Sequence, residues 1–166
     1  MVEIILPTNL LSVIRGKYLL LDTSVFIDAF NHPSEFTEFL NDLRIQEVTL
    51  LTIDLVKIEF LKGAPDDDRY KEKEALIDKI VDEILIPTPD ITTNVYSLLK
   101  KYRLDGKAAS ITDLHLGAYL KKFASSLYLL TRNPSDFPLN VFKLMSVVNV
   151  SYMKGIHAYG VFQYKL

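Results

Sequence analysis

The chain has 166 residues, of which 49% are hydrophobic and 24% charged, and these values are typical of one globular domain. Its 19 Lys and Arg residues and 21 Asp and Glu residues give a net charge of -2, which excludes a general electrostatic attraction to nucleic acid. The absence of cysteine excludes disulfides, zinc–thiolate sites and cysteine nucleophiles, and it is compatible with the cytoplasmic location that we expect.

Neither a membrane span nor a secretion signal is expected. The longest apolar runs are far shorter than the roughly 18 residues that a span requires. The apolar stretch from Met1 to Gly16 carries Glu3 and Pro7, and it lacks an early basic segment and a small-residue cleavage site. We therefore predict a single domain over residues 1–166.

Apolar runs alternate with helical patterns along the chain. Continuous runs of this length are typical of strands that are buried on both faces. The predicted strands are Tyr18–Leu21, Val48–Ile53, Ile84–Ile86, Leu127–Thr131 and a strand within Val141–Val148. The predicted helices are Val25–Phe30, Pro33–Leu43, Asp54–Lys62, Asp68–Glu83, Ile91–Tyr102 and Lys107–Phe123.

This alternation predicts an α/β fold, with a mostly parallel central sheet and helices on both faces. Ligands of such sheets bind beyond the carboxyl ends of the strands, which is where chemistry is expected. The tail Asn149–Leu166, which is rich in aromatic residues, is expected to be strand-like or to form a dimer contact.

Two acidic residues follow predicted strands directly. Asp22 comes after the first strand, where a helix N-cap is the alternative interpretation. Asp136 follows the fourth strand in a segment of turn-forming residues, where ordinary turn chemistry is the alternative.

Two further acidic residues lie on apolar faces of predicted helices. Glu59 shares a face with Leu55 and Val56, and a charge there is costly unless it is paired with Lys62, binds a cation or is left exposed by a shallow helix. Asp113 shares a face with Gly117, and a first-turn role at the helix dipole is its alternative. Together, the four acids are predicted to meet at one edge of the sheet, where they would repel each other unless a hard divalent cation binds.

With these acids in place, the chain resembles the PIN-domain family, and in length the VapC-type toxin ribonucleases. Four motifs occur in the family's order: an apolar strand ending in Asp-Thr-Ser, a Glu in a helix, an Asp that opens a small apolar helix, and a Thr-x-Asn followed by Asp-Phe. They are found in Leu19–Ile27, Ile58–Gly63, Ile111–Ala118 and Thr131–Phe137. The resemblance covers about residues 18–146, and Gly117 departs from it, because family members more often have Ala near this position.

The resemblance implies a three-layer α/β/α sandwich and RNA cleavage that depends on Mg²⁺ or Mn²⁺, with a frequent homodimer and, for toxins, an antitoxin partner. It places Asp22, Asp113 and Asp136 at the metal, with Glu59 completing the cluster and orienting the attacking water. Thr23, Thr131 and Asn133 would position the substrate or the acids. Arg132 is expected to neutralise RNA phosphates.

Other functions are weighed against this one. A non-catalytic PIN-like module that binds RNA or protein is the main alternative, although the intact acid set favours an enzyme. A phosphatase with Asp22 as the nucleophile would have a second Asp where Ser24 stands, and no glycine-rich loop follows the first strand to bind a dinucleotide. His115 lies two residues from Asp113 and is predicted to be structural, because such side chains do not share a helix face.

Overall fold

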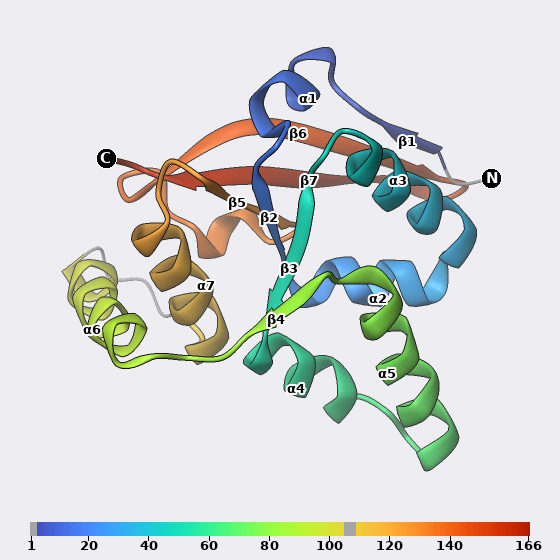
Figure 1. The fold of residues 1–166 in the computed structure, drawn as a ribbon, viewed down its shortest axis with the longest axis horizontal. Coiled ribbons are helices and arrows are strands. Elements are labelled where there is room, and N and C mark those ends of the chain that lie inside the picture. Colours follow the sequence, from blue (N-terminus) through green and yellow to red (C-terminus); the bar gives the residue numbers. More distant parts are fainter. Residues whose placement is uncertain (1–2, 105–108) are drawn as a thin grey trace.

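The computed structural model describes residues 3–104 and 109–166, and in these residues it contains seven α-helices and one mixed sheet of seven strands (Figure 1). The strand order is β1-β6-β7-β5-β2-β3-β4. The strands are β1 (Glu3–Ile5), β2 (Tyr18–Leu21), β3 (Thr49–Ile53), β4 (Glu83–Leu85), β5 (Leu127–Thr131), β6 (Phe142–Tyr152) and β7 (Gly155–Tyr164). The predicted α/β class is confirmed.

One half of the sheet is parallel and contains the strands that lead into the acidic residues. β2 lies between β5 and β3, and β4 pairs with the far side of β3. Every residue of β5 is buried, as are the last three residues of β2, which explains their continuous apolar sequences. Because β2, β3 and β5 run in the same direction, their carboxyl ends meet at one edge of the sheet.

The other half of the sheet is antiparallel. β6 and β7 form a long hairpin, β7 pairs with β5, and β1 pairs with the outer side of β6. Gly160 of β7 lies opposite Thr131 of β5, and a Cβ atom at Gly160 would come within 2.4 Å of the Phe162 ring. The ring of Phe162, two residues along the same strand, lies over the glycine, so a larger residue at position 160 would displace this ring. The strand expected in the tail is confirmed, whereas β1 was not predicted.

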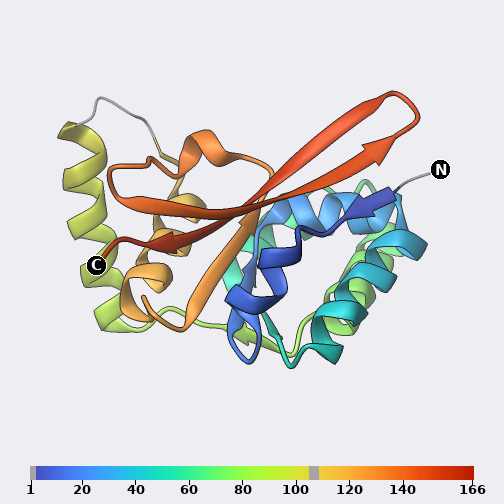
Figure 2. The ribbon, with the colours of Figure 1, turned by 90° about the horizontal axis from the view of Figure 1, so that it is seen from above.

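The helices lie on either side of the parallel strands. α6 and α7 lie on one side, and α2, α3 and α5 lie on the other (Figures 1 and 2). Fully buried residues of α2 and α7, such as Phe26 and Leu116, fill the core on the two sides. The helices are α1 (Thr8–Ile14), α2 (Thr23–Asn31), α3 (Pro33–Ile45), α4 (Asp54–Lys62), α5 (Asp67–Ile80), α6 (Pro89–Leu104) and α7 (Ile111–Lys122). No helix within the described part of the chain is long and apolar enough to cross a membrane.

Two predicted helix boundaries are wrong. The helix predicted to reach Glu83 ends at Ile80, because the Asp82 carboxylate accepts a hydrogen bond from the Leu50 backbone N–H at 2.8 Å and the next residue enters β4. The helix predicted to begin at Lys107 begins at Ile111, after Ala109 and Ser110 in irregular structure. Lys107 itself lies outside the described residues.

Candidate functional site

Asp22 lies directly beyond β2 and is 4% exposed. One carboxylate oxygen accepts a hydrogen bond from the backbone N–H of Thr23 at 2.7 Å, so Asp22 does cap α2. The other accepts from the hydroxyls of Thr131 at 2.6 Å and Ser24 at 3.4 Å. Burial raises the pKa of Asp22, the hydrogen bonds from Thr131 and Thr23 oppose this rise, and the charge of Glu59 adds to it.

Glu59 is exposed, which agrees with the alternative that its helix leaves this side chain in solvent. The buried face of α4 is formed by Val56, Phe60 and Leu61 instead. The carboxylate of Glu59 accepts a hydrogen bond of 2.7 Å from the Thr23 hydroxyl. Thr23 therefore joins the two acids, since its backbone N–H binds Asp22 and its side chain binds Glu59.

Asp113 lies in the first turn of α7, where it forms a reciprocal cap with Ser110. The Ser110 hydroxyl oxygen accepts from the Asp113 backbone N–H at 3.0 Å, and the hydroxyl donates to the Asp113 carboxylate at 2.7 Å. Burial raises the pKa of Asp113 to about 6, and the charges of Asp136 and Asp22 add to this rise. The Asp113 carboxylate thus takes part in the cap of α7. It also interacts electrostatically with Asp136 and Asp22.

The segment after β5 contains the last acid and the residues expected to position it. The fully buried Thr131 hydroxyl accepts from the Asn133 backbone N–H at 3.0 Å and donates to Asp22, so it links this segment to the end of β2. The Asn133 side chain itself is exposed. Asp136 closes a short 3₁₀ helix, Pro134–Asp136, and is half-buried.

The four acids form one electrostatic neighbourhood, because Asp22 interacts with Glu59, and Asp113 interacts with both Asp136 and Asp22. Among the described residues, no three acidic or histidine side chains lie close enough together to hold a metal ion jointly. The donor set consists of carboxylate oxygens, which suits Mg²⁺ or Mn²⁺, and Mg²⁺ usually keeps several waters and binds through only one or two carboxylates. The residues present therefore fit a hydrated hard cation.

From the sequence, Arg132 was considered as a residue that neutralises RNA phosphates. In the structure its side chain forms an ion pair with Asp28. Its Nη1 donates to both carboxylate oxygens of Asp28, at 2.8 and 3.0 Å, and to His157 Nδ1 at 3.0 Å. The Asp28 side chain is only 6% exposed and accepts a further hydrogen bond from the Tyr159 hydroxyl. The Arg132 backbone N–H donates to the Ser24 hydroxyl, so this ion pair adjoins the hydrogen bonds of Asp22.

Two residues around the site, Ser110 and Asp28, were not predicted, although the sequence contains a pattern that indicates each of them. Ser110 and Asp113 have the Ser-x-x-Asp spacing of a capping box. Asp28 follows Val25 and Phe26 on the buried face of α2, where an acid needs a partner. The structural interpretation of His115 is confirmed, since its Nδ1 lies 2.8 Å from the carbonyl oxygen of Ile111.

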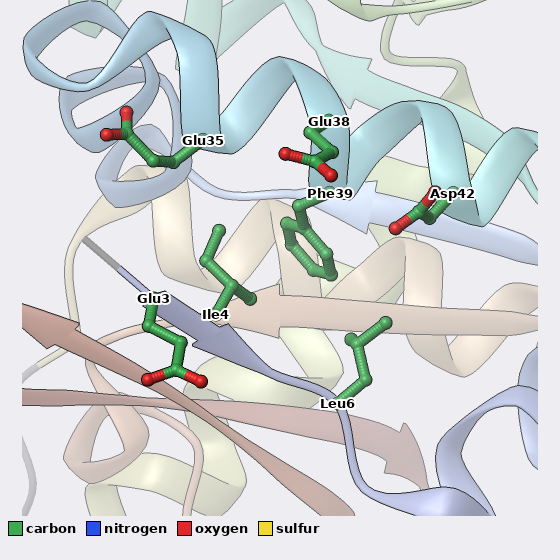
Figure 3. Close-up of a pocket in the computed structure, with 7 residues that line it drawn as sticks. All are labelled: Glu3, Ile4, Leu6, Glu35, Glu38, Phe39 and Asp42. Atoms are coloured by element: carbon green, nitrogen blue, oxygen red, sulfur yellow. The ribbon is translucent and has the colours of Figure 1, made fainter. Parts of the chain in front are cut away.

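A separate pocket of about 240 Å³ lies between β1 and α3. Figure 3 shows Glu3 on the strand and Glu35, Glu38 and Asp42 along the helix, beside the apolar side chains of this pocket. None of the predicted site residues lines it. This pocket therefore lies apart from the candidate site.

The chain was compared with known proteins. Residues 19–134, more than half of the chain, match the PIN domain family. A structure of VapBC2 from Rickettsia felis bound to a DNA fragment from their promoter is similar, with 18% identity and a TM-score of 0.60 over 72% of this chain and 90% of that chain. VapBC-1 from nontypeable Haemophilus influenzae is also similar, with 16% identity and a TM-score of 0.58 over the same shares of the two chains. Comparison with curated proteins gave no significant match. The extent of the family match shows that this chain belongs to the PIN domain family.

Proposed function

We propose that the protein is a metal-dependent endoribonuclease that cleaves RNA phosphodiester bonds at Asp22, Glu59, Asp113 and Asp136. The observation that carries this proposal is the group of mutually interacting acids, of which two have raised pKa values. Shifts that combine burial with specific charged neighbours are typical of functional sites. Membership of the PIN family supports the same conclusion. Helices on both sides of the sheet support the three-layer α/β/α arrangement.

The chain's own hydroxyl groups orient the acids. Thr131 fixes one oxygen of Asp22, Thr23 holds Glu59, and Ser110 holds Asp113. Asp22, Asp113 and Asp136 would bind the cation, directly or through water. The cation supplies charge stabilisation at the phosphoryl group and activates water. Glu59 is exposed, so its carboxylate is accessible to orient the attacking water.

RNA cleavage is expected to require Mg²⁺ or Mn²⁺ and to stop when EDTA is added. The physical reason is that these carboxylates repel each other and form no ion pair with any described residue, so a bound cation would relieve the repulsion. The measurement is cleavage of a labelled single-stranded RNA across a metal titration, with Mn²⁺ restored after EDTA as the control for irreversible damage. Undiminished cleavage in excess chelator would overturn the mechanism.

We also propose that the nuclease is the toxin of a toxin–antitoxin pair. The similar solved structures are VapBC assemblies, and their likeness to this chain lies in the fold. A groove of about 360 Å³ between α2, α4 and α5 offers a surface for a partner. Its lining combines apolar side chains with two basic side chains, and it includes Ile27, Phe30, Phe60, Arg69 and Lys73. An antitoxin segment with apolar side chains and a carboxylate would match this lining.

The protein is expected to co-purify with the product of a small neighbouring reading frame, and this complex should cleave RNA more slowly than the free chain. Ile27→Glu should weaken the complex, because it places a charge in the apolar groove, while the 41% exposure of Ile27 keeps the cost to folding small. Ile45→Glu is the matched control, since Ile45 on α3 is 73% exposed and lies outside the groove. Equal binding by both variants would remove the groove from the interface.

The homodimer predicted from the sequence stays a proposal. Met153 and Ile156, at the tip of the β6–β7 hairpin, are 90% and 68% exposed. Such apolar side chains at a protruding tip support association with a second copy.

A further inference from the structure

Tyr102 is a buried residue of α6 whose hydroxyl group is unsatisfied. The residue is 1% exposed, and within the described ranges its hydroxyl has no hydrogen-bond partner. Its ring packs edge-to-face against Phe142 of β6, with 6.5 Å between the ring centroids. A buried hydroxyl without a partner lowers the stability of the folded chain. A tyrosine here in place of phenylalanine therefore points to a role for the hydroxyl group.

The position of this hydroxyl relates it to the acidic site. A Cβ atom at Gly117 of α7 would lie 3.6 Å from the Tyr102 hydroxyl oxygen, so the hydroxyl lies against the helix at Gly117. Gly117 follows Asp113 by four residues and therefore shares its face of α7. Burial raises the pKa of Tyr102, and the charges of Asp113 and Asp136 raise it further, which shows that both acids lie within electrostatic reach.

Gly117 lies at a crowded point of the core, beside the Tyr102 hydroxyl. A Cβ atom there would also lie 2.9 Å from the tip of the Phe142 ring and 3.0 Å from a Leu98 methyl group. Alanine would therefore crowd the buried side chains that hold the tyrosine. The glycine that departs from the family pattern thus lets Phe142 and Leu98 pack closely against α7, next to the Tyr102 hydroxyl.

We propose that Tyr102 is a positioning residue of the acidic site, whose hydroxyl donates a hydrogen bond to the Asp113–Asp136 carboxylate pair when a divalent cation draws these acids together. This rests on the proposed function, because it assumes that the acids bind a cation. Carboxylates that bind metals are usually held by hydrogen bonds from surrounding groups, and loss of such a group typically weakens metal binding about 10- to 100-fold. Ser110 already holds Asp113 from the side of the helix cap, and Tyr102 would hold the pair from α6.

Tyr119 provides a matched control on α7. It is also buried, at 3% exposure, and its hydroxyl is likewise unsatisfied among the described residues. Burial is the largest cause of the raised pKa of Tyr119. The charges of Asp90 and Asp54 add to it, and neither residue belongs to the proposed site. An unsatisfied tyrosine hydroxyl is therefore not specific to the site by itself, and the effect on metal binding must separate the two residues.

The experiment compares the parent protein with Tyr102→Phe, Tyr119→Phe and Asp113→Asn. Calorimetric titration with Mn²⁺ alone gives the affinity, and thermal melts with EDTA and with Mn²⁺ give stability. Both phenylalanine variants should melt in EDTA at the parent's temperature or above it, because each loses an unpaired buried hydroxyl. Tyr102→Phe should bind Mn²⁺ about tenfold more weakly or worse. Tyr119→Phe should bind it like the parent.

The outcomes separate the two proposals. If the parent binds no Mn²⁺, or if Asp113→Asn binds it as well as the parent does, the acidic metal site itself is wrong and the role of Tyr102 fails with it. If the parent binds Mn²⁺ and Tyr102→Phe binds it equally well, only the role of Tyr102 is wrong. Equal weakening by both phenylalanine variants would also overturn that role. Failure of Tyr102→Phe to fold would show that the hydroxyl has a structural partner, and would overturn it too.

Discussion

Replacing Asp113 by asparagine should reduce RNA cleavage by at least about 100-fold, because an amide is a much poorer ligand for a hard cation than a carboxylate. The change is nearly isosteric. The amide oxygen of the new side chain can still accept from the Ser110 hydroxyl, so the first turn of α7 keeps its cap. The measurement is the single-turnover cleavage rate at saturating Mn²⁺.

The same substitution should leave the metal-free protein as stable as the parent or more so. The pKa of Asp113 is about 6 in the folded chain, compared with 3.8 for an unperturbed Asp, so its ionised form destabilises the folded state. This penalty is absent below about pH 4, grows as the pH rises towards 6 and is complete above it. Removing the charge should therefore stabilise the apoprotein at pH 7 by on the order of 1 kcal/mol.

Two measurements test this pair of effects together. Thermal melts in EDTA at pH 4 and pH 7 should show that Asp113→Asn gains stability relative to the parent only at the higher pH. Ser110→Ala serves as a control that removes the cap and keeps the charge, and it should lower stability at both pH values. If Asp113→Asn cleaves RNA at the parent's rate, Asp113 does not belong to the site, whatever the melting temperature of the variant.

Replacing Arg132 by leucine should lower the free energy of unfolding by about 3 kcal/mol, because it leaves the buried Asp28 carboxylate without its cation. This value lies at the low end for breaking a buried ion pair, since the Arg132 side chain is 31% exposed and solvent screens part of the interaction. The Tyr159 hydroxyl would remain as a hydrogen-bond donor to the carboxylate. Chemical denaturation at pH 7 gives the free energy.

Two further variants identify the cause of that loss. Asp28→Asn should cost less than Arg132→Leu, because the partly exposed arginine can turn towards solvent, whereas the buried carboxylate cannot. Arg69→Leu is the control for an exposed pair, since Arg69 and Glu72 are 54% and 55% exposed, and it should cost less than about 1 kcal/mol. If Arg132 instead serves to bind RNA phosphates, Arg132→Leu would slow cleavage and leave the unfolding curve unchanged.

The parallel half of the fold was predictable because β2, β3 and β5 are almost entirely buried and have continuous apolar sequences. The run Tyr18–Leu21 was assigned with correct limits, as was α4 at Asp54–Lys62. The antiparallel half was harder to predict, because β6 alternates buried and exposed residues along part of its length and one of its partners, β1, is distant in the sequence. β1 has only three residues and is specified by its pairing with β6, which no local pattern reveals.

At the candidate site, the sequence indicated the acids but not all of their surroundings. Asp22 and Asp136 were found because each follows a strand, and strand direction determines where such residues lie. Glu59 lies near Asp22 as an exposed side chain, which was one of the alternatives that the helical pattern left open. The pairing of Arg132 with Asp28 was not predicted, because Asp28 lies 104 positions away in the sequence and only the folded chain brings the two together.

The place of β7 in the sheet has a consequence for how the protein is made. β7 follows every other strand in the sequence, yet it lies inside the sheet, between β6 and β5. Synthesis proceeds from the N-terminus, so β5 has one side open for pairing until the residues around Gly160 have emerged. Thr131 and Arg132 gain their neighbours on β7 at that same late step. Until β7 has been added, a growing chain should therefore lack these contacts beside the candidate site and present the open edge of β5, which can pair with other chains.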